Sequence, residues 1–531
     1  MRLDKVYIDG FKNLKNLDVD FDEQKLTTVL IGQNGTGKSN LIEAITQIFQ
    51  SVDLNRNKPR FQYRITYRIK STSSATGQTA RVTLSNITGE PAYCVDGTPL
   101  KQSEFDNRKD DLFPDLVFGY YSGGSRRLES LFDNHQRRYY DAIKREKNPE
   151  KVAAAQTARR MFYCRPIHGV LALMSLFSFP DKKLTEELGT KLGITGFHSL
   201  LGLFREPWFA KAMKPAQRTP ENFWGATGPA GRTAHLFKTV AYHPLALEGN
   251  AIDDYRDKQQ TESQYATFLP SLDHLKHLAS NFASEREMFY ALEAMDISDL
   301  IREMLVWVTR TNDASGDVSF ADLSDGERQL LMVLGLIRVS RGKRALFLLD
   351  EPDTHLNPHW QHSYLRLIED WTGIAADVDK CHIILTSHNP LTIAALSRDE
   401  VRVIYSDSIS KALVAEQPFV DPRGLGVSGV LTDIFGLTST LDIPTQELID
   451  TRNKLARIEE LNEAQTVALD TINEQLRVLG FMYEERDQLY RDFLKTVDDV
   501  ELAERRPRTP DELKKRDQVT REVVEQLLRK Q

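Results

Sequence analysis

Two phosphate-handling motifs, far apart in the sequence, most constrain how this chain can fold. Residues Gly32–Ser39 read GQNGTGKS and fit the pattern GxxxxGK[ST]. Residues 346–351 read LFLLDE, an apolar run that ends in two acids, and LSDGERQ precedes it at 323–329. The stretch between Ser39 and Ser324 is too long for a simple nucleotide-binding domain. The sequence therefore predicts one such domain, interrupted by a large insert.

The first motif lies in the context that a phosphate loop needs. Residues Leu26–Ile31 (LTTVLI) have the length and β-branched composition of a buried strand, and apolar residues recur at helical spacing after Ser39. Glycines let backbone N–H groups turn toward a phosphate, and a helix N-terminus adds a favourable field. We expect Lys38 to reach the β- and γ-phosphates and Ser39 to complete a magnesium shell. The predicted nucleotide ligands are Gly32, Gln33, Asn34, Gly35, Thr36, Gly37, Lys38, Ser39 and Asn40.

Acidic residues follow a second buried strand. The run Ala345–Leu349 is fully apolar, as in a central parallel strand, and Asp350 and Glu351 follow at the strand end where α/β sheets bind ligands. Asp350 is the expected magnesium ligand, and Glu351 is the candidate base for the attacking water. Adjacent acids can also do no more than solvate a strand end.

A third apolar strand, His382–Thr386, ends in Ser387-His388-Asn389-Pro390. His388 should then share the sheet edge with Asp350, where it is a candidate γ-phosphate sensor, although a lone histidine is more often structural. Asp353–Pro358 (DTHLNP) is expected to form a loop across a dimer axis.

The segment LSDGERQ opens a strongly apolar helix. Ser324 and Glu327 have the spacing of a capping box, in which each side chain satisfies a backbone N–H of the helix start. The same helix start, with Ser324 and the backbone of Gly326, can bind an anion. A second anion site suggests that the γ-phosphate is clamped from two sides.

The four motifs, in this order, resemble the ABC-type ATPase heads of the SMC, RecF and OLD group over roughly residues 1–125 and 300–420. The resemblance implies an α/β fold, with a mixed sheet flanked by helices, and Mg²⁺-dependent ATP hydrolysis. Two heads would sandwich two ATP molecules, with Lys38, Ser39, Asp350, Glu351 and His388 of one subunit facing Ser324, Gly326 and Glu327 of the other. The catalytic residues would be Glu351, His388 and Lys38. Gln62 is a candidate for the family's Q-loop glutamine.

Four regions are expected along the chain: the N-terminal lobe of the head (1–125), a helical insert (126–299), the C-terminal lobe (300–430) and a helical extension (431–531). The first half of the insert mixes basic and aromatic residues, a composition that suits either nucleic-acid contact or a solvated helical face. These are Arg126, Arg127, Arg137, Arg138, Lys144, Arg145, Arg159 and Arg160, with Tyr139, Tyr140, Phe162 and Tyr163. The apolar positions of the extension suit either packing on its own head or docking of a partner.

Composition favours a cytoplasmic protein. The longest apolar stretch, Gly169–Phe179, is far too short for a membrane helix, and the first residues read as a strand and not as a signal peptide. The three cysteines lack CxxC spacing, so neither disulfides nor zinc are indicated. The net charge of −7 gives no global attraction to nucleic acid.

The output chemistry is expected on another protein. OLD-type proteins carry a nuclease marked by an EGxxD-like strand end, but Val401–Tyr405 is followed by Ser406 and Asp407 and no such element appears downstream. A head with a compact insert, a helical tail and no nuclease resembles the ATPases of Septu antiphage systems (PtuA), including copies carried by retrons. That resemblance implies a homodimer or higher homo-oligomer and a separate HNH nuclease (PtuB-like). In retrons, a reverse transcriptase and its msDNA would be further partners. The alternative is a DNA-binding repair ATPase of the RecF and SMC kind.

Overall fold

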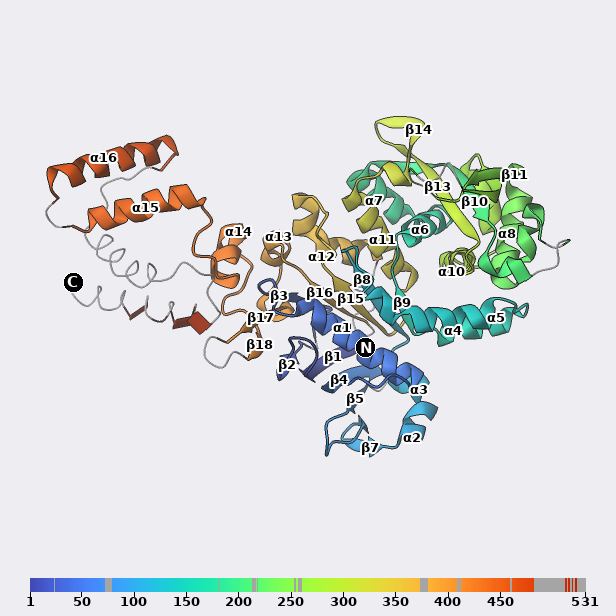
Figure 1. Cartoon of the computed structure of the whole chain (residues 1–531), viewed down its shortest axis with the longest axis horizontal. Coiled ribbons are helices and arrows are strands. Elements are labelled where there is room, and N and C mark those ends of the chain that lie inside the picture. Colours follow the sequence, from blue (N-terminus) through green and yellow to red (C-terminus); the bar gives the residue numbers. More distant parts are fainter. Residues whose placement is uncertain are drawn as a thin grey trace. The chain divides into compact units, whose positions relative to one another are not determined.

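A computed structural model describes the chain except residues 23, 72–78, 180, 213–215, 217, 253–254, 256–259, 373–380, 408–411, 459–460, 482–510, 513, 516–517, 519–520 and 523–531. The chain forms two compact units (Figure 1). Unit 1 comprises Met1–Ile31 and Gly37–Thr392, and unit 2 comprises Gly32–Thr36 and Ile393–Gln531. Each unit is described separately.

Unit 1 begins with an antiparallel sheet of order β2-β1-β4-β5-β6-β7. Its strands are β1 (Arg2–Asp9), β2 (Leu17–Asp20), β4 (Gln62–Lys70), β5 (Thr79–Ser85), β6 (Tyr93–Val95) and β7 (Thr98–Leu100). Burial alternates along β2, as expected when one face of a sheet packs on the core. Short helices α2 (Gln102–Asn107) and α3 (Lys109–Leu112) follow.

A parallel sheet of order β3-β16-β15-β8-β9 forms the centre of unit 1. Its strands are β3 (Thr27–Ile31), β16 (Cys381–Thr386), β15 (Ala345–Asp350), β8 (Leu116–Tyr121) and β9 (Met161–Tyr163). Helix α1 (Lys38–Leu54) packs on β15 and β8. Strands β3, β15 and β16 are buried throughout, which explains their continuous apolar runs. Asp350 is paired in register with Thr386 of β16 and Tyr121 of β8, so the carboxyl ends of three strands meet at one edge.

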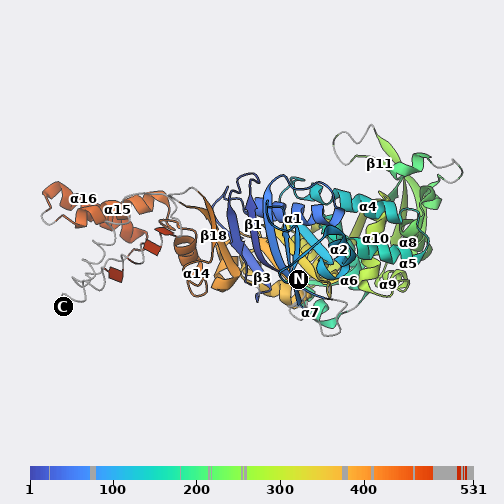
Figure 2. The same cartoon turned by 90° about the horizontal axis from the view of Figure 1, so that it is seen from below.

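The region after β8 contains helices and strands. The helices are α4 (Asp133–Ile143), α5 (Pro149–Ala158), α6 (Ile167–Ser178), α7 (Lys182–Leu192), α8 (Gly228–Val240), α9 (Leu272–Ala279) and α10 (Glu285–Ile297). Helices α6, α8, α9 and α10 pack on one another (Figure 1, Figure 2). An antiparallel sheet of order β11-β12-β10-β13-β14 accompanies them. Its strands are β10 (Ile194–Arg205), β11 (Tyr242–Asn250), β12 (Thr261–Leu269), β13 (Ile301–Arg310) and β14 (Asp313–Ser319).

These strands correct the expectation of a purely helical insert over 126–299. The helical periodicity of its first half is real, but β10 alternates in burial and pairs along its length with β12 and β13. The sheet also extends to Ser319, beyond the boundary expected at residue 299. Strand β9 lies in the sequence of the insert but pairs with β8 in the parallel sheet.

Unit 1 continues with α11 (Asp325–Val339), α12 (Pro358–Thr372) and α13 (Pro390–Ala394). Helix α11 packs closely on α6, where a Cβ added at Gly335 would lie 2.8 Å from the Cβ of Ala172. This contact anchors α11, which the LSDGERQ motif opens and which we call the signature helix, to α6, the first strongly apolar helix of the insert.

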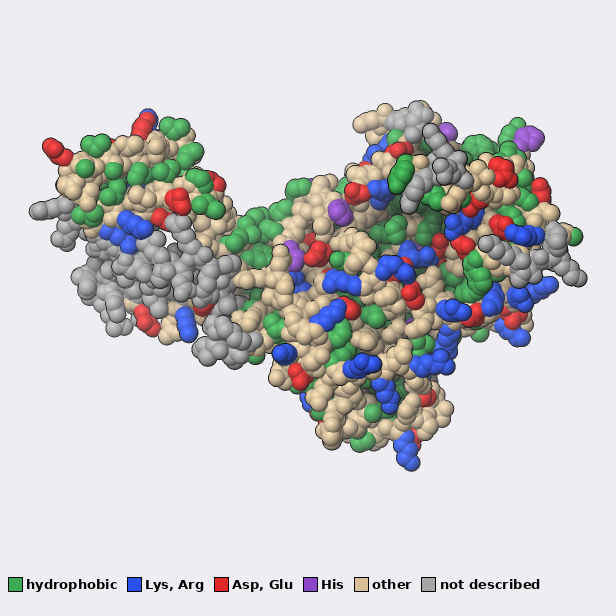
Figure 3. Space-filling view, in the orientation of Figure 1, with side chains coloured by type: hydrophobic (Ala, Val, Ile, Leu, Met, Phe, Trp, Pro, Cys, Tyr) green, Lys and Arg blue, Asp and Glu red, His purple; other side chains and the backbone are tan. Residues whose placement is uncertain are grey.

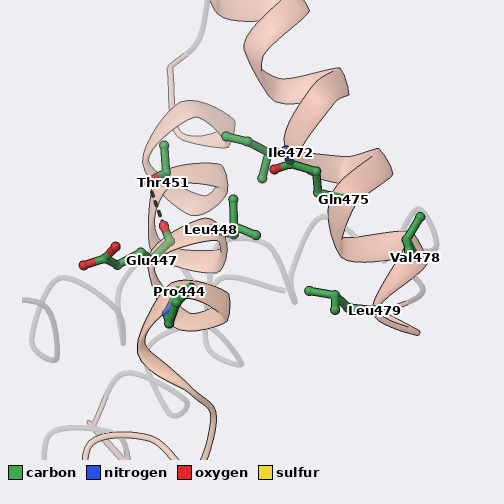
Figure 4. A pocket seen from close by; sticks show the side chains of 8 residues that line it. All are labelled: Pro444, Glu447, Leu448, Thr451, Ile472, Gln475, Val478 and Leu479. Atoms are coloured by element: carbon green, nitrogen blue, oxygen red, sulfur yellow. Dashed lines mark hydrogen bonds between the residues drawn. The ribbon is translucent and has the colours of Figure 1, made fainter.

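Unit 2 contains an antiparallel pair, β17 (Val401–Ser406) and β18 (Leu413–Glu416), followed by helices. These are α14 (Gly426–Gly429), a π-helical turn (Val430–Ile434), α15 (Ile443–Ala456) and α16 (Glu463–Val478). Helices α15 and α16 pack as a hairpin with a partly apolar groove between them (Figure 4). The groove is lined by Pro444, Glu447, Leu448, Thr451, Ile472, Gln475, Val478 and Leu479. The extension expected over 431–531 is helical in these elements, and its residues 482–510 lie outside the described residues.

Among the described residues, no helix combines the length and the apolar character needed to cross a bilayer.

Candidate nucleotide site

The loop Gly32–Thr36 follows β3 and belongs to unit 2. The backbone N–H and the Oγ1 of Thr36 both donate to the carbonyl of Gln33, at 3.3 and 2.9 Å. Gly35 has φ +85°, a left-handed conformation that glycine adopts at little cost. A Cβ at Gly32 would overlap the carbonyl oxygen of Ile404, so this glycine is required by a close backbone approach.

The start of α1 provides the next residues of the motif. Gly37 has φ +95°, and a Cβ there would lie 2.6 Å from Leu14 and 2.8 Å from the Oδ1 of Asn13. Asn40 donates from Nδ2 to the same Asn13 oxygen at 2.7 Å, which fixes the first turn of the helix. Lys38 is buried, and burial lowers the pKa of its amine to about 8 despite the opposing effects of Glu351 and Asp350. A buried amine next to two acids is suited to bind an anionic phosphate.

Ser39 and Asp350 meet at the carboxyl edge of the parallel sheet. The Ser39 Oγ donates to Asp350 Oδ1 at 2.9 Å, and the Oγ1 of Thr386 donates to the same oxygen at 2.6 Å. Magnesium prefers hydroxyl and carboxylate oxygens, and Ser39 and Asp350 bring one of each together. The two residues therefore fit a magnesium ion, with Thr386 orienting the carboxylate.

Glu351 follows Asp350 in a strained backbone conformation. Its φ is +53°, rare for a residue with a side chain, and its N–H donates to the Oγ1 of Thr386 at 2.9 Å. His388 Nε2 lies 3.6 Å from Glu351 Oε1. Burial, then the charge of Asp350, raises the pKa of Glu351, whereas burial and then Lys38 lower the pKa of His388. A carboxylate with a raised pKa beside a neutral histidine suits a general base.

The loop Asp353–Pro358 is fixed from within unit 1. The carboxylate of Asp353 is buried and accepts from the Oγ of Ser387 and the Oγ1 of Thr392, both at 2.6 Å. Burial raises the pKa of Asp353. The carbonyl of His355 lies above the signature helix, where a Cβ at Gly326 would come within 2.5 Å of it. Gly326 is therefore also required by packing within its own chain.

The capping box at the start of α11 is present. The Ser324 N–H and Oγ both donate to Glu327 Oε2, at 2.8 and 2.9 Å, and the Glu327 N–H donates back to the Ser324 Oγ at 3.3 Å. Glu327 is also paired with Arg310 of β13. Within the part of the chain that the structure describes, this capping network contains none of the phosphate-loop residues. The hydrogen bonds of Ser324 and Glu327 in the capping box thus involve neither the Ser39–Asp350 pair nor the Glu351–His388 pair.

Arg127 is a residue of the site that sequence reasoning missed. Its Nη2 donates to Asp350 Oδ2 at 2.7 Å, and its guanidinium carbon lies 4.5 Å from the ring centroid of Tyr121. The sequence offers no local signal for this contact because the partners are 223 positions apart. The candidate Gln62 instead starts β4 and is paired with Asp9 in the antiparallel sheet.

Some of the basic and aromatic residues of the insert are buried inside the protein, whereas others are exposed. Arg159 forms a buried ion pair with Glu293 at 2.7 Å and stacks on Tyr139 and Phe162. Arg160 is paired with Asp53 of α1 at 3.5 Å. Over α4 and α5, basic and acidic side chains lie side by side (Figure 3). Exposed basic residues such as Arg137 and Arg138 remain on α4, so nucleic-acid contact in this region stays a prediction.

Two family models match the chain. One is described as an AAA ATPase domain and matches residues 1–116. The other is described as an AAA domain, putative AbiEii toxin, type IV TA system, and matches residues 232–394. Together they contain all the motif residues of the site.

The chain is also similar to curated proteins. The Septu protein PtuA of Bacillus mycoides (strain KBAB4) is 25% identical over 226 residues, which are 40% of this chain and 31% of that protein. The Septu protein PtuA of Bacillus thuringiensis is 28% identical over 142 residues, 24% of this chain and 34% of that protein. The DNA replication and repair protein RecF of Lactobacillus acidophilus is 51% identical over 45 residues, 8% of this chain and 12% of that protein. The matched segments span about a third of the length of the two Septu relatives.

The ATPase domain models, the geometry of the phosphate loop and the order of the motifs all indicate the same class of site, one that binds a nucleotide. Two ATPase domain models match parts of the chain, and the chain is similar to the Septu protein PtuA.

Proposed function

We propose that this chain is the ATP-hydrolysing regulatory subunit of an antiphage defence system. Two copies dimerise head to head around ATP and control a separate HNH nuclease. The observation that carries the proposal is the meeting of Ser39, Asp350, Glu351 and His388 at one sheet edge, in a chain similar to Septu PtuA. The cytoplasm is the proposed location.

Each residue of the edge has a role in hydrolysis. Lys38 pairs with the β- and γ-phosphates as a cation, and the backbone of Gly32–Gly37 with Asn40 holds the phosphate chain in place. Ser39 and Asp350 hold Mg²⁺, which neutralises developing phosphate charge when bound. Glu351 orients the attacking water and accepts its proton. His388, which lies beside Glu351, donates to the γ-phosphate.

The second half of each site comes from the other chain. Ser324 and Gly326 offer a helix N-terminus to the γ-phosphate, and Glu327 holds that helix start in shape through the capping box. Among the described residues, the hydrogen bonds of the capping box include neither Lys38 nor Asp350, and this helix start is proposed to serve the site of the other chain. A site assembled from two chains couples hydrolysis to dimerisation.

The partner nuclease is proposed to dock on the α15–α16 groove. Leu448 and Ile472 face each other across it, and Val478 and Leu479 extend the apolar surface at one end (Figure 4). Val478 is 79% exposed, more than expected for a large apolar residue of a hairpin without a partner. In retron-carried copies, the reverse transcriptase and its msDNA are additional candidate partners.

The dimer is tested with the full-length Glu351→Gln variant. With Mg²⁺ and ATP, light scattering after size exclusion should show a mass twice that of the nucleotide-free protein, because ATP persists in the closed dimer. ADP should give no such change. An unchanged mass with ATP contradicts the head-to-head dimer.

The docking site is tested by co-purification with the HNH protein encoded beside this chain. Ile472→Asp should abolish the complex, since it places a charge in the groove. Val467→Asp is the matched control, because Val467 lies on the same helix, is 65% exposed and does not line the groove. Loss of the complex with both variants, or with neither, contradicts docking at this groove.

A DNA-binding repair ATPase is the second candidate, favoured by the short segment shared with RecF. It predicts ATP-dependent DNA binding that weakens steeply with salt. The internal pairing of Arg159 and Arg160 counts against a DNA surface in that region. Tight, salt-sensitive binding of DNA ends by the isolated chain, with no nuclease partner, would favour this alternative.

A further inference from the structure

The carboxylate of Asp350 accepts three hydrogen bonds from side chains of its own chain. Oδ1 accepts from Ser39 and Thr386, and Oδ2 accepts from the guanidinium of Arg127 at 2.7 Å. The Asp350 side chain is only 2% exposed, whereas that of Arg127 is 33% exposed. Arg127 is therefore a counter-ion that can reach the carboxylate from the solvent side and leave again.

Arg127 and the expected magnesium ion compete for one carboxylate. A cation bound to Asp350 and Ser39 would repel a guanidinium that remains on the same group. The stacking on Tyr121 gives Arg127 a second attachment 4.5 Å from the ring centroid, so release from Asp350 does not require the whole side chain to detach.

We propose that Arg127 is a positioning residue that balances the charge of Asp350 and is displaced from it when Mg²⁺-nucleotide binds. This inference rests on the proposed function of the same site. Arg127 thereby sets the Mg²⁺ concentration at which the head loads.

The position of Arg127 also connects this exchange to the insert. Ser130 donates from Oγ to the carbonyl of Arg127 at 3.2 Å, and Gln50 of α1 donates from Nε2 to the carbonyl of Leu131 at 2.5 Å. Phe132 is buried against Gly119 of β8, where no Cβ could be accommodated. The segment between Arg127 and α4 is thus held by the phosphate-loop helix on one side and by β8 on the other. Arg127 therefore lies at the start of the insert, in a segment that contacts both α1 and β8.

The neighbouring Arg126 is a matched control. It has the same charge, is 67% exposed and is paired with Glu129 and Asp133 at 3.0 and 3.2 Å. Its substitution changes the net charge of the loop by the same amount as substitution of Arg127, but leaves the Arg127–Asp350 pair in place.

The test is a Mg²⁺ titration of nucleotide binding with the full-length protein and a fluorescent ADP analogue. For Arg127→Ala we expect the half-saturating Mg²⁺ concentration to fall about fivefold to tenfold, because a charge-assisted hydrogen bond no longer competes. Arg127→Gln removes the charge but keeps a donor, and should shift the concentration in the same direction by less. Arg127→Lys should restore a value near that of the unmodified protein, as should Arg126→Ala.

Thermal unfolding without nucleotide provides an independent readout. Arg127→Ala should unfold at a lower temperature than Arg126→Ala, and added Mg²⁺ alone should narrow the difference, since the ion replaces the lost charge at Asp350. If Arg127→Ala cannot be purified folded, the Arg127→Gln titration decides.

The inference is overturned if the Mg²⁺ requirement is unchanged or rises in Arg127→Ala and Arg127→Gln while nucleotide still binds. Failure of the unmodified chain to bind nucleotide at any Mg²⁺ concentration would instead overturn the proposed function. The two failures are therefore distinguishable.

Discussion

Two of the arginine–carboxylate pairs in the molecule differ in their exposure to solvent. At the sheet edge, Arg127 reaches Asp350 from a partly exposed loop, and hydroxyl groups of Ser39 and Thr386 share the carboxylate. In the insert, Arg159 and Glu293 are 6% and 0% exposed and are enclosed by aromatic rings and helices. The Arg127–Asp350 pair can exchange its cation for another. The Arg159–Glu293 pair, here called the sealed pair, is closed to solvent. The same chemistry can thus regulate a site or fix a fold, and access to solvent decides which.

The sealed pair belongs to a larger buried network. His168 of α6 is fully buried, and its Nε2 lies 3.7 Å from Glu293. Arg165 is paired with Asp296 on the same helix as Glu293. Burial lowers the pKa of His168 and raises the pKa of Glu293, and Arg159 opposes the second shift. These groups connect α6 and α10 with Arg159 at the end of α5.

The largest expected effect belongs to the sheet edge and is chemical. Glu351→Gln should lower kcat for ATP hydrolysis by about 10²–10⁴-fold, the usual contribution of a general base. The unfolding temperature should stay close to that of the unmodified protein, since Gln fills the same space. If instead the variant unfolds readily and hydrolysis per folded molecule is preserved, Glu351 is a structural residue. The contrast between a chemical sheet edge and a structural buried pair would then be wrong.

The next effect belongs to the sealed pair and concerns stability. Glu293→Ala should cost about 3–5 kcal/mol of unfolding free energy, because it leaves the buried charge of Arg159 unpaired. Urea unfolding followed by circular dichroism measures this loss. Asp141→Ala is the control, since Asp141 is 47% exposed and its pairing with Lys144 should contribute under about 1 kcal/mol. The separation of the two regions also predicts that folded Glu293→Ala binds nucleotide normally. It would be contradicted if the free energy of nucleotide binding changed more than the free energy of unfolding.

The pH dependence of hydrolysis sharpens the description of the edge. Glu351 must be deprotonated to accept a proton, and its pKa is raised by burial and Asp350. Activity should therefore be lost, as pH falls, at a pH above the ordinary 4.5 of a glutamate. A kcat profile between about pH 5 and 8 measures this acid limb, with nucleotide binding followed in parallel. A limb at or below 4.5 would show that Glu351 is solvated like a surface acid.

A smaller effect is proton uptake by Lys38 on nucleotide binding. The pKa of its buried amine is about 8, and pairing with phosphate should raise it, so binding should take up about half a proton at pH 8. The uptake should vanish well below pH 8, where the amine is already charged. Calorimetry in buffers of different ionisation enthalpy measures it. Lys38→Arg, which stays charged, should abolish the uptake while retaining binding, and persistent uptake would assign the proton to another group.

The smallest expected effect on stability is that of Ser324→Ala. Loss of the capping box should cost about 1 kcal/mol, measured by urea unfolding, because the Glu327 N–H loses its acceptor. Hydrolysis should fall far more than this loss explains if Ser324 also contacts nucleotide in the dimer. If hydrolysis falls only as much as the loss of folded protein explains, Ser324 acts as a helix cap and does not contact the nucleotide.

Local patterns in the sequence predicted the elements that carry the motifs. The β-branched run before Gly32 forms β3, the apolar run before Asp350 forms β15, and the spacing of Ser324 and Glu327 produces the capping box. Each of these depends on residues that are neighbours in sequence. The roles assigned to Glu351, His388 and Ser324 remain predictions.

Long-range partnerships could not be predicted. Arg127 and Arg159 looked alike as basic residues of the insert, but their acidic partners lie 223 and 134 positions away. Strand β10 was missed because its alternation is interrupted at the bulges where it pairs with β13. Helical periodicity near the start of the insert gave no information about β10, β12 and β13, whose residues pair with one another only after the chain has folded.

The central claim is that each ATP site is completed by two chains, and a mixing experiment tests it most directly. Ser324→Arg blocks the signature helix, and Glu351→Gln blocks the catalytic edge, so each variant alone should hydrolyse almost no ATP. In an equal mixture, half of the dimers should contain both variants, and one of their two sites should be intact. The mixture should recover about a quarter of the unmodified activity. Activity no greater than that of the separate variants would contradict a site shared between chains.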